Sequence, residues 1–182
     1  MRIITFIIML LLATSAHAGV VEYTNKAAWQ NAVSSYQTLD FTGLPPGLPI
    51  LGLYQEQYGV TFAPGSQTHH SSSMLNDGQG VRGQPGSRMF FDTPQKWIAV
   101  DHPGNIVFNL YFQGALIYTS NEFWGTGGFA GLISDMHFDE VYLYRITAPG
   151  LVFYDDLYFG VPAPGALGVF ALAAFGCRRR RR

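Results

Sequence analysis

The stretch that decides the fold class is IVFNLYFQGALIY, Ile106 to Tyr118. It contains two runs of β-branched and aromatic residues, Ile106 to Phe112 and Ala115 to Tyr118, and such runs favour strands. Only Gln113-Gly114 separates them, and a two-residue connection that contains glycine is typical of a tight hairpin turn. The sequence therefore predicts an antiparallel β-hairpin here.

Comparable runs, bounded by Gly, Pro, Asn and Asp, recur on both sides of this hairpin and predict further strands. They are Val20 to Thr24, Thr38 to Phe41, Tyr58 to Phe62, Arg88 to Phe91, Trp97 to Val100, Val141 to Ile146 and Leu151 to Phe159. A helical period occurs only at Asn25 to Val33, where Asn25 can cap one short helix. The polar stretch Ala63 to Gly86 reads as a long loop with at most one short strand. Many short strands with one helix predict an all-β domain, a single antiparallel two-sheet sandwich.

The N-terminal residues 1–18 have the organisation of a secretory signal peptide. Arg2 gives the positive start, Ile3 to Ala13 form a short apolar run, and Ala16 and Ala18 are the small residues that a signal peptidase reads. We expect cleavage before Gly19 and export by the general secretory route. The mature β-sandwich domain then spans residues 19–161.

The C-terminal residues 162–182 combine a proline-rich break, an apolar segment and a cationic end. The break Val161-Pro162-Ala163-Pro164 is followed by Gly165 to Cys177, which would rise only about 20 Å as a helix, against about 30 Å of hydrocarbon. Five arginines close the chain: Arg178, Arg179, Arg180, Arg181 and Arg182. Arginines stay on the cytoplasmic side, so they form a cytoplasmic stop and the domain lies across the membrane from them. We expect a short transmembrane tail that anchors the chain transiently in the inner membrane.

This tail resembles a PEP-CTERM sorting signal of exported Gram-negative proteins. The resemblance implies processing by an exosortase, a membrane-embedded cysteine transpeptidase, and a final location at the cell surface or outside the cell. The sequence departs from the family at Ala163, where the name-giving motif has glutamate. Shorter patterns inside the domain, such as Tyr23 to Trp29 and Tyr154 to Gly160, are similar to sandwich domains that accompany this tail. They imply a jelly-roll-like sandwich with an extracellular or matrix role.

The charge of the domain differs from that of the whole chain. Six of the eleven Lys and Arg residues lie in the two terminal signals. Residues 19–161 therefore contain five Lys and Arg residues and all twelve Asp and Glu residues, which gives a net charge of −7. An acidic domain without a basic stripe argues against binding to nucleic acid. The single cysteine, Cys177, lies in the tail, so the domain has no disulfide.

Asp155 and Asp156 are the candidate metal ligands. In one extended strand Asp155 shares a face with Leu151, Phe153, Leu157 and Phe159, and a carboxylate buried among apolar side chains needs a partner. Ca²⁺ is one candidate partner, held by Asp155 or Asp156 and by Asp40 near the start of the domain. A β-bulge that turns Asp155 outward, or backbone amides from a neighbouring loop, are the alternatives.

No catalytic residue is predicted. The chain has neither the Gly-x-Ser-x-Gly nor the His-Glu-x-x-His motif, and the histidines form no recognisable triad. We therefore expect a non-enzymatic surface or matrix protein, associated with exopolysaccharide or biofilm. The alternative is a carbohydrate-binding module, stabilised by Ca²⁺, that uses outward-facing aromatic residues; an exported hydrolase is the third hypothesis. The aromatic candidates are Tyr54, Tyr111, Tyr118, Trp124, Tyr142, Tyr144, Tyr154 and Tyr158.

Overall fold

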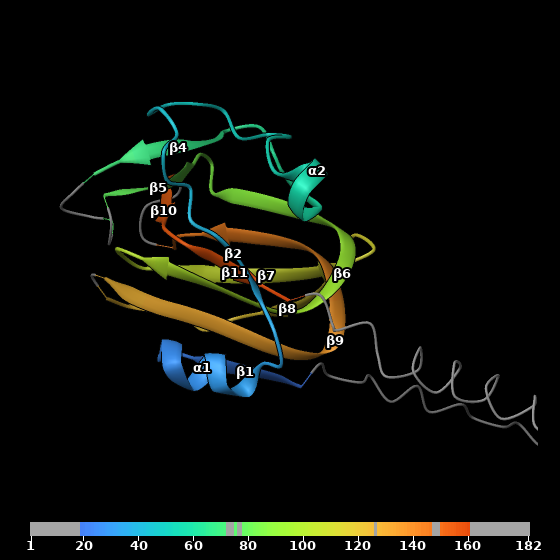
Figure 1. Ribbon diagram of the computed structural model, residues 1–182. Coiled ribbons are helices and arrows are strands. Elements are labelled where there is room, and N and C mark those ends of the chain that lie inside the picture. Colours follow the sequence, from blue (N-terminus) through green and yellow to red (C-terminus); the bar gives the residue numbers. More distant parts are fainter. Residues whose placement is uncertain (1–18, 72–74, 76–77, 126, 147–149, 161–182) are drawn as a thin grey trace, which may run out of the picture.

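The computed structural model describes residues 19–71, 75, 78–125, 127–146 and 150–160, which form an antiparallel, mostly β structure (Figure 1). The two helices are α1 (Lys26–Ala32) and α2 (Gln55–Tyr58). The strands are β1 (Val20–Tyr23), β2 (Gln37–Leu39), β3 (Val60–Phe62), β4 (Ser66–His70), β5 (Gln79–Gly83), β6 (Ser87–His102), β7 (Val107–Phe112), β8 (Ala115–Thr119), β9 (Gly128–Tyr144), β10 (Val152–Tyr154) and β11 (Leu157–Phe159).

The two layers of the sandwich are joined by two long bent strands, β6 and β9 (Figure 1). The first part of β6 pairs with the last part of β9, between β3 and β7, and β8 follows at the edge. The second part of β6 pairs with the first part of β9, between β11 and β1, and β2 lies outside β11. Register shifts occur between Phe90 and Gln95 and between Gln95 and Trp97, where extra residues bend a strand. The predicted antiparallel, mostly β fold is confirmed: β6 and β9 belong to one eight-stranded sheet and run through both layers, and three further strands form a separate sheet.

One hydrophobic core lies between these layers. It takes Met89 and Val141 from one half of the long strands and Val100 and Leu132 from the other. We call the layer that contains β1, β2 and β11 the lower layer. A second, smaller cluster lies between the outer face of this layer and α1. There Trp29, fully buried, packs with Ala99, Phe129 and Tyr158.

Asn25 caps α1 as predicted, because its side-chain oxygen accepts a hydrogen bond from the backbone N–H of Ala28 at 2.9 Å. The predicted hairpin is also present as β7 and β8. Gln113 and Gly114 have φ values of 51° and 78°, the left-handed pair that such a turn requires.

Several expectations about helices and strands are wrong. A second short helix, α2, forms and includes Tyr58 of the predicted strand Tyr58 to Phe62, and the predicted strand Val141 to Ile146 is the last part of β9, which ends at Tyr144. The supposed loop Ala63 to Gly86 contains two strands, β4 and β5, which with β10 form a separate three-stranded sheet. The segments Arg88 to Phe91 and Trp97 to Val100 belong to one continuous strand, β6. The segment Leu151 to Phe159 is divided, because β10 pairs in the small sheet whereas β11 pairs with β2 and β6 in the large one.

The predicted signal peptide and the sorting tail lie outside the described residues. In the described ranges, no helix has the length and apolar character needed to cross a membrane.

Candidate functional site

The Asp155-Asp156 pair lies where the chain passes from the small sheet to the large one. Its backbone continues the pairing with β6: the Asp155 N–H donates to the Asp101 carbonyl at 2.8 Å, and the Asp101 N–H donates to the Asp156 carbonyl at 3.2 Å. Side chains alternate along the strand from here. Asp155 therefore points to the core side with Leu157, whereas Asp156 and Tyr158 point toward α1.

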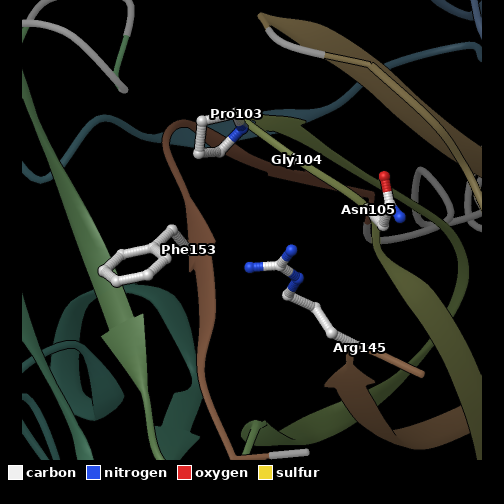
Figure 2. A pocket seen from close by; sticks show the side chains of 5 residues that line it. All are labelled: Pro103, Gly104, Asn105, Arg145 and Phe153. Atoms are coloured by element: carbon white, nitrogen blue, oxygen red, sulfur yellow. The ribbon is translucent and has the colours of Figure 1, made fainter. Parts of the chain in front are cut away.

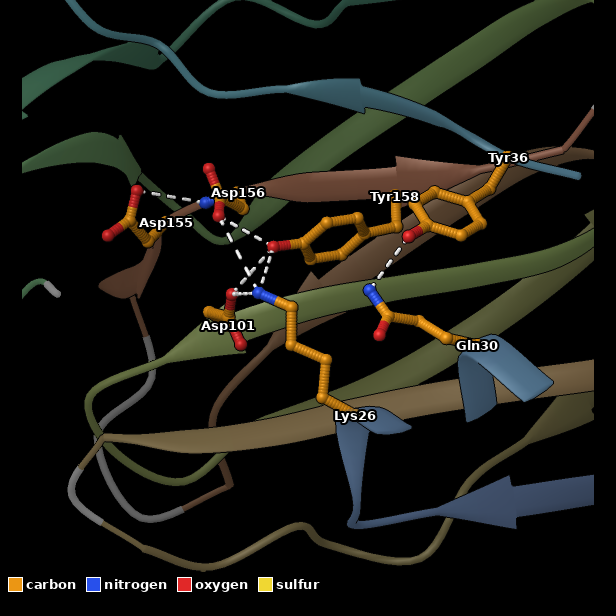
Figure 3. A network of polar contacts seen from close by, with 7 residues as sticks. All are labelled: Lys26, Gln30, Tyr36, Asp101, Asp155, Asp156 and Tyr158. Atoms are coloured by element: carbon orange, nitrogen blue, oxygen red, sulfur yellow. Dashed lines mark hydrogen bonds and ion pairs between the residues drawn. The ribbon is translucent and has the colours of Figure 1, made fainter. Parts of the chain in front are cut away.

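On the α1 side, four polar side chains meet (Figure 3). The Lys26 ammonium donates to Asp101 Oδ2 at 2.8 Å and to the Tyr158 hydroxyl, and it lies 3.8 Å from Asp156 Oδ2. The Tyr158 hydroxyl lies 2.6 Å from Asp156 Oδ2 and 2.9 Å from Asp101 Oδ2. We call Lys26, Asp101, Asp156 and Tyr158 the lysine network.

The lysine network is a structural tie between α1, β6 and β11. Two carboxylates face one ammonium, and the side chain of Asp101 is only 6% exposed. Burial, together with the hydrogen bonds to Asp156 and Asp101, raises the pKa of Tyr158 far above its usual range, so its hydroxyl stays protonated. A phenol held in this state donates a hydrogen bond but supplies no base at neutral pH.

The structure does not bring the three predicted metal ligands together. Asp155 is buried, as predicted, and the backbone N–H of Asp156 donates to its Oδ1 at 2.9 Å. Asp40 is exposed and accepts from the Thr42 N–H at 3.2 Å. Among the residues that the structure describes, no group of three or more His, Cys, Asp and Glu side chains could hold a metal ion. The Ca²⁺ hypothesis thus stays a prediction without a described site.

Several of the aromatic candidates for sugar stacking are buried or already packed against other side chains. Tyr154 and Tyr158 are buried, so neither of them is among the outward-facing aromatic residues. Tyr142 stacks on Tyr144 with ring centroids 5.4 Å apart, and the Arg88 guanidinium lies over the Tyr142 ring while paired with Glu140 at 2.6 Å. Trp124, at 68% exposed, is the freest of the eight.

A pocket that the sequence did not indicate lies at the end where β6 turns into β7 (Figure 2). Its volume is about 180 Å³, and its lining is Pro103, Gly104, Asn105, Arg145 and Phe153. These residues come from three places: the turn after β6, the residue after β9, and β10. In Figure 2 the Arg145 guanidinium reaches into the space between Phe153 and the turn. We call this the Arg145 pocket.

His102 positions the turn that lines the Arg145 pocket. Its ring Nδ1 is hydrogen-bonded to the Gly104 carbonyl, which requires the proton on Nδ1. Burial lowers the pKa of His102, so the imidazole is neutral at pH 7 and keeps this role across the neutral range.

Two described residues, Gly19 and Gly160, lie next to the predicted processing sites in the sequence. Ala16 and Ala18 lie outside the described residues, but Gly19 is described: its backbone N–H donates to Asp135 Oδ1 at 2.9 Å, and the Asp135 N–H donates back to the Gly19 carbonyl at 3.0 Å. At the other end Gly160 is buried, and its N–H is 3.4 Å from the Trp97 carbonyl. The sorting motif Val161, Pro162, Ala163 and Pro164 and the arginines 178–182 lie outside the described residues.

No family model and no curated protein matches the sequence. Among solved structures, the exo-β-1,3-galactanase of Phanerochaete chrysosporium, crystallised with galactose, is similar with a TM-score of 0.35 and 9% identity. The match covers 70% of this chain and 30% of that one. The chain thus spans less than a third of that enzyme, and a likeness at this level does not bear on function.

Proposed function

We propose that this chain is an exported, non-enzymatic surface or extracellular-matrix protein, released from a transient inner-membrane anchor when an exosortase processes its tail. Signal peptidase and an exosortase-type transpeptidase are its processing partners in this account, and exopolysaccharide is the matrix component that it meets. The jelly-roll-like form of the sandwich is part of the same proposal. A carbohydrate-binding role is the second candidate, favoured by the Arg145 pocket.

The observations that carry the proposal are the signal-peptide pattern of residues 1–18 and the sorting-signal pattern of residues 162–182. The first described strand, β1, starts at Val20, two residues after Ala18, and the Gly19 backbone forms one hydrogen bond with the Asp135 side chain and one with its backbone N–H. The last strand, β11, ends at Phe159 between two partner strands, two residues before the sorting motif. Cutting at both predicted sites would therefore leave every described strand intact.

Asp135 is placed to receive the new N-terminus. After cleavage the Gly19 nitrogen becomes an α-ammonium group next to a carboxylate oxygen that is already 2.9 Å away. An exposed ion pair of this kind contributes about 0.2–1 kcal/mol. We expect Asp135→Ala to make the Gly19 amine of the mature protein react about two- to fivefold faster with an amine acylating reagent at pH 7, as followed by mass spectrometry.

Asp139→Ala is the matched control, since it removes the same charge from a residue that instead accepts from the Gln113 N–H at 3.0 Å. Equal acylation rates in both variants and the parent protein would show that Asp135 does not hold the mature N-terminus.

Export is tested by protease digestion of intact spheroplasts from a Gram-negative host that expresses the full chain. We expect external protease to remove the domain, and we expect a variant lacking residues 1–18 to be protected inside the cell. Protection of both forms would contradict the proposal.

A further inference from the structure

The Arg145 guanidinium has no partner among the residues that the structure describes. Among the described residues it forms neither an ion pair nor a hydrogen bond, and its Nε is buried without an acceptor. Buried polar groups are nearly always hydrogen-bonded, so an unpaired one needs a reason. The other two arginines in the described ranges have partners: Arg88 pairs with Glu140, and Arg82 donates to Gln84.

The shape of the pocket leaves room in front of this cation. A Cβ added to Gly104 would lie 4.0 Å from Cζ and Nη2 of Arg145, so the turn passes beside the guanidinium without covering it. Phe153 lines the other side, and the Asn105 amide stands at the rim (Figure 2). The Arg145 guanidinium, the Phe153 ring and the Asn105 amide all border a space of about 180 Å³.

The small sheet of β4, β5 and β10 lies next to the pocket and carries a further cationic, a further amide and a further aromatic side chain on one face. On β4, β5 and β10 the residues Gln67, Arg82 and Phe153 stand directly opposite one another, so their side chains share one face. All three are half-buried, whereas Thr68, Val81 and Tyr154, which alternate with them, are buried. The His69 ring packs against Phe153 at 4.9 Å. The outer face of the small sheet is thus amphipathic and carries a second cation in a domain of net charge −7.

We propose that the Arg145 pocket binds the carboxylate of an acidic sugar, a uronate residue of an anionic polysaccharide. A guanidinium binds a carboxylate through two parallel N–H···O bonds, which a neutral hydroxyl cannot reproduce. Phe153 offers an apolar surface to the sugar ring, and Asn105 offers donors and an acceptor to its hydroxyls. Neighbouring sugar units then lie along Gln67 and Arg82 on the face of the small sheet.

The guanidinium pocket stands independently of export, but assigning the carboxylate to a sugar rests on the proposed matrix role. The alternative source of the carboxylate is a protein partner with an exposed Asp, Glu or C-terminus. The experiment below uses the purified mature protein, so a failure of binding and a failure of export are separate results.

The test is isothermal titration with three probes: an oligogalacturonate, a neutral galactan oligomer of equal length, and an acidic peptide of equal charge. We expect the oligogalacturonate to bind at least tenfold more tightly than either of the others. Arg145→Gln should weaken that binding by about ten- to a hundredfold, the effect of losing a charge-assisted bidentate contact. Arg145→Lys keeps the charge but loses the planar pair of N–H donors, so its affinity should lie between that of the parent protein and that of Arg145→Gln.

Two further variants keep the result interpretable. Gly104→Leu fills the space while leaving Arg145 in place, so it should weaken binding as Arg145→Gln does. Lys96→Gln removes one positive charge at the bend of β6, outside the pocket lining, and should change affinity less than twofold. Absence of oligogalacturonate binding, or binding that Arg145→Gln and Gly104→Leu both leave unchanged, would overturn the site. Tighter binding of the acidic peptide would overturn the sugar assignment.

Discussion

Replacing Trp29 with alanine is expected to lower the free energy of unfolding by about 3–5 kcal/mol, the usual range for truncating a buried tryptophan. Trp29 is fully buried between α1 and the lower layer, with the Phe129 ring 5.8 Å and the Tyr158 ring 6.1 Å away. Its loss leaves a cavity beneath a seven-residue helix, and a helix of this length is not stable alone in water. Urea denaturation of the mature protein, followed by circular dichroism, measures the effect.

Gln30→Ala is the control for Trp29→Ala, since the neighbouring Gln30 side chain is half-buried and donates one exposed hydrogen bond, to the Tyr36 hydroxyl at 2.8 Å. It should change stability by less than about 0.5 kcal/mol. If Trp29→Ala does not fold, Trp29→Phe retains part of the contact and should show an intermediate loss. A Trp29→Ala protein as stable as the parent would mean that α1 is not packed as described.

Replacing Lys26 with methionine is expected to cost about 1–3 kcal/mol. Removing one partner of a buried ion pair costs about 3–5 kcal/mol because the other charge stays buried, but Lys26 itself is 40% exposed and its contribution is reduced by solvent. Methionine retains the apolar stem and removes the ammonium, so Asp101 and Asp156 face each other across the Tyr158 hydroxyl without a cation. The same denaturation experiment measures this loss.

Two further variants measure how much of the lost stability is due to the charge of Lys26. Lys26→Arg keeps a cation in the lysine network and should recover part of the stability. Asp101→Asn combined with Lys26→Met removes the uncompensated charge and should be less destabilising than the sum of the single changes. Strict additivity would show that Lys26 and Asp101 do not interact in solution.

The parts of the fold that local chemistry decides were predictable. The Gln113-Gly114 turn and the Asn25 cap each depend on one or two neighbouring residues, and both are present. The sequence favours a loop for β4 and β5 because their buried positions are Ser66, Thr68, Gly80 and Gly83, with Val81 the one aliphatic residue among them. Ser66 is satisfied by Ser87 at 3.0 Å and Thr68 by the Pro45 carbonyl at 2.5 Å, pairings that only the tertiary structure supplies.

The candidate sites were predictable only in part, for the same reason. The burial of Asp155 follows from strand alternation, and Asp156 with Tyr158 shows the same period of two. Their partners Lys26 and Asp101 are 75 residues apart in the chain and meet because α1 packs on the sheet beside β6, an arrangement that local sequence does not contain. The Arg145 pocket is even harder to predict from the sequence, because Arg145, the turn at Gly104 and Phe153 come from three separate parts of the chain. The one available signal is that Arg145 is one of only five cations in residues 19–161.

The central claim, an exported domain trimmed at both ends, is tested most directly by intact mass. The protein would be recovered from the envelope and the medium of a Gram-negative host, with and without its exosortase. We expect a species that begins at Gly19 and ends between Pro162 and Gly165, replaced in the absence of exosortase by a membrane-bound species that still ends at Arg182. A mature chain that retains Arg182 in the presence of the exosortase, or that still begins at Met1, would contradict the account.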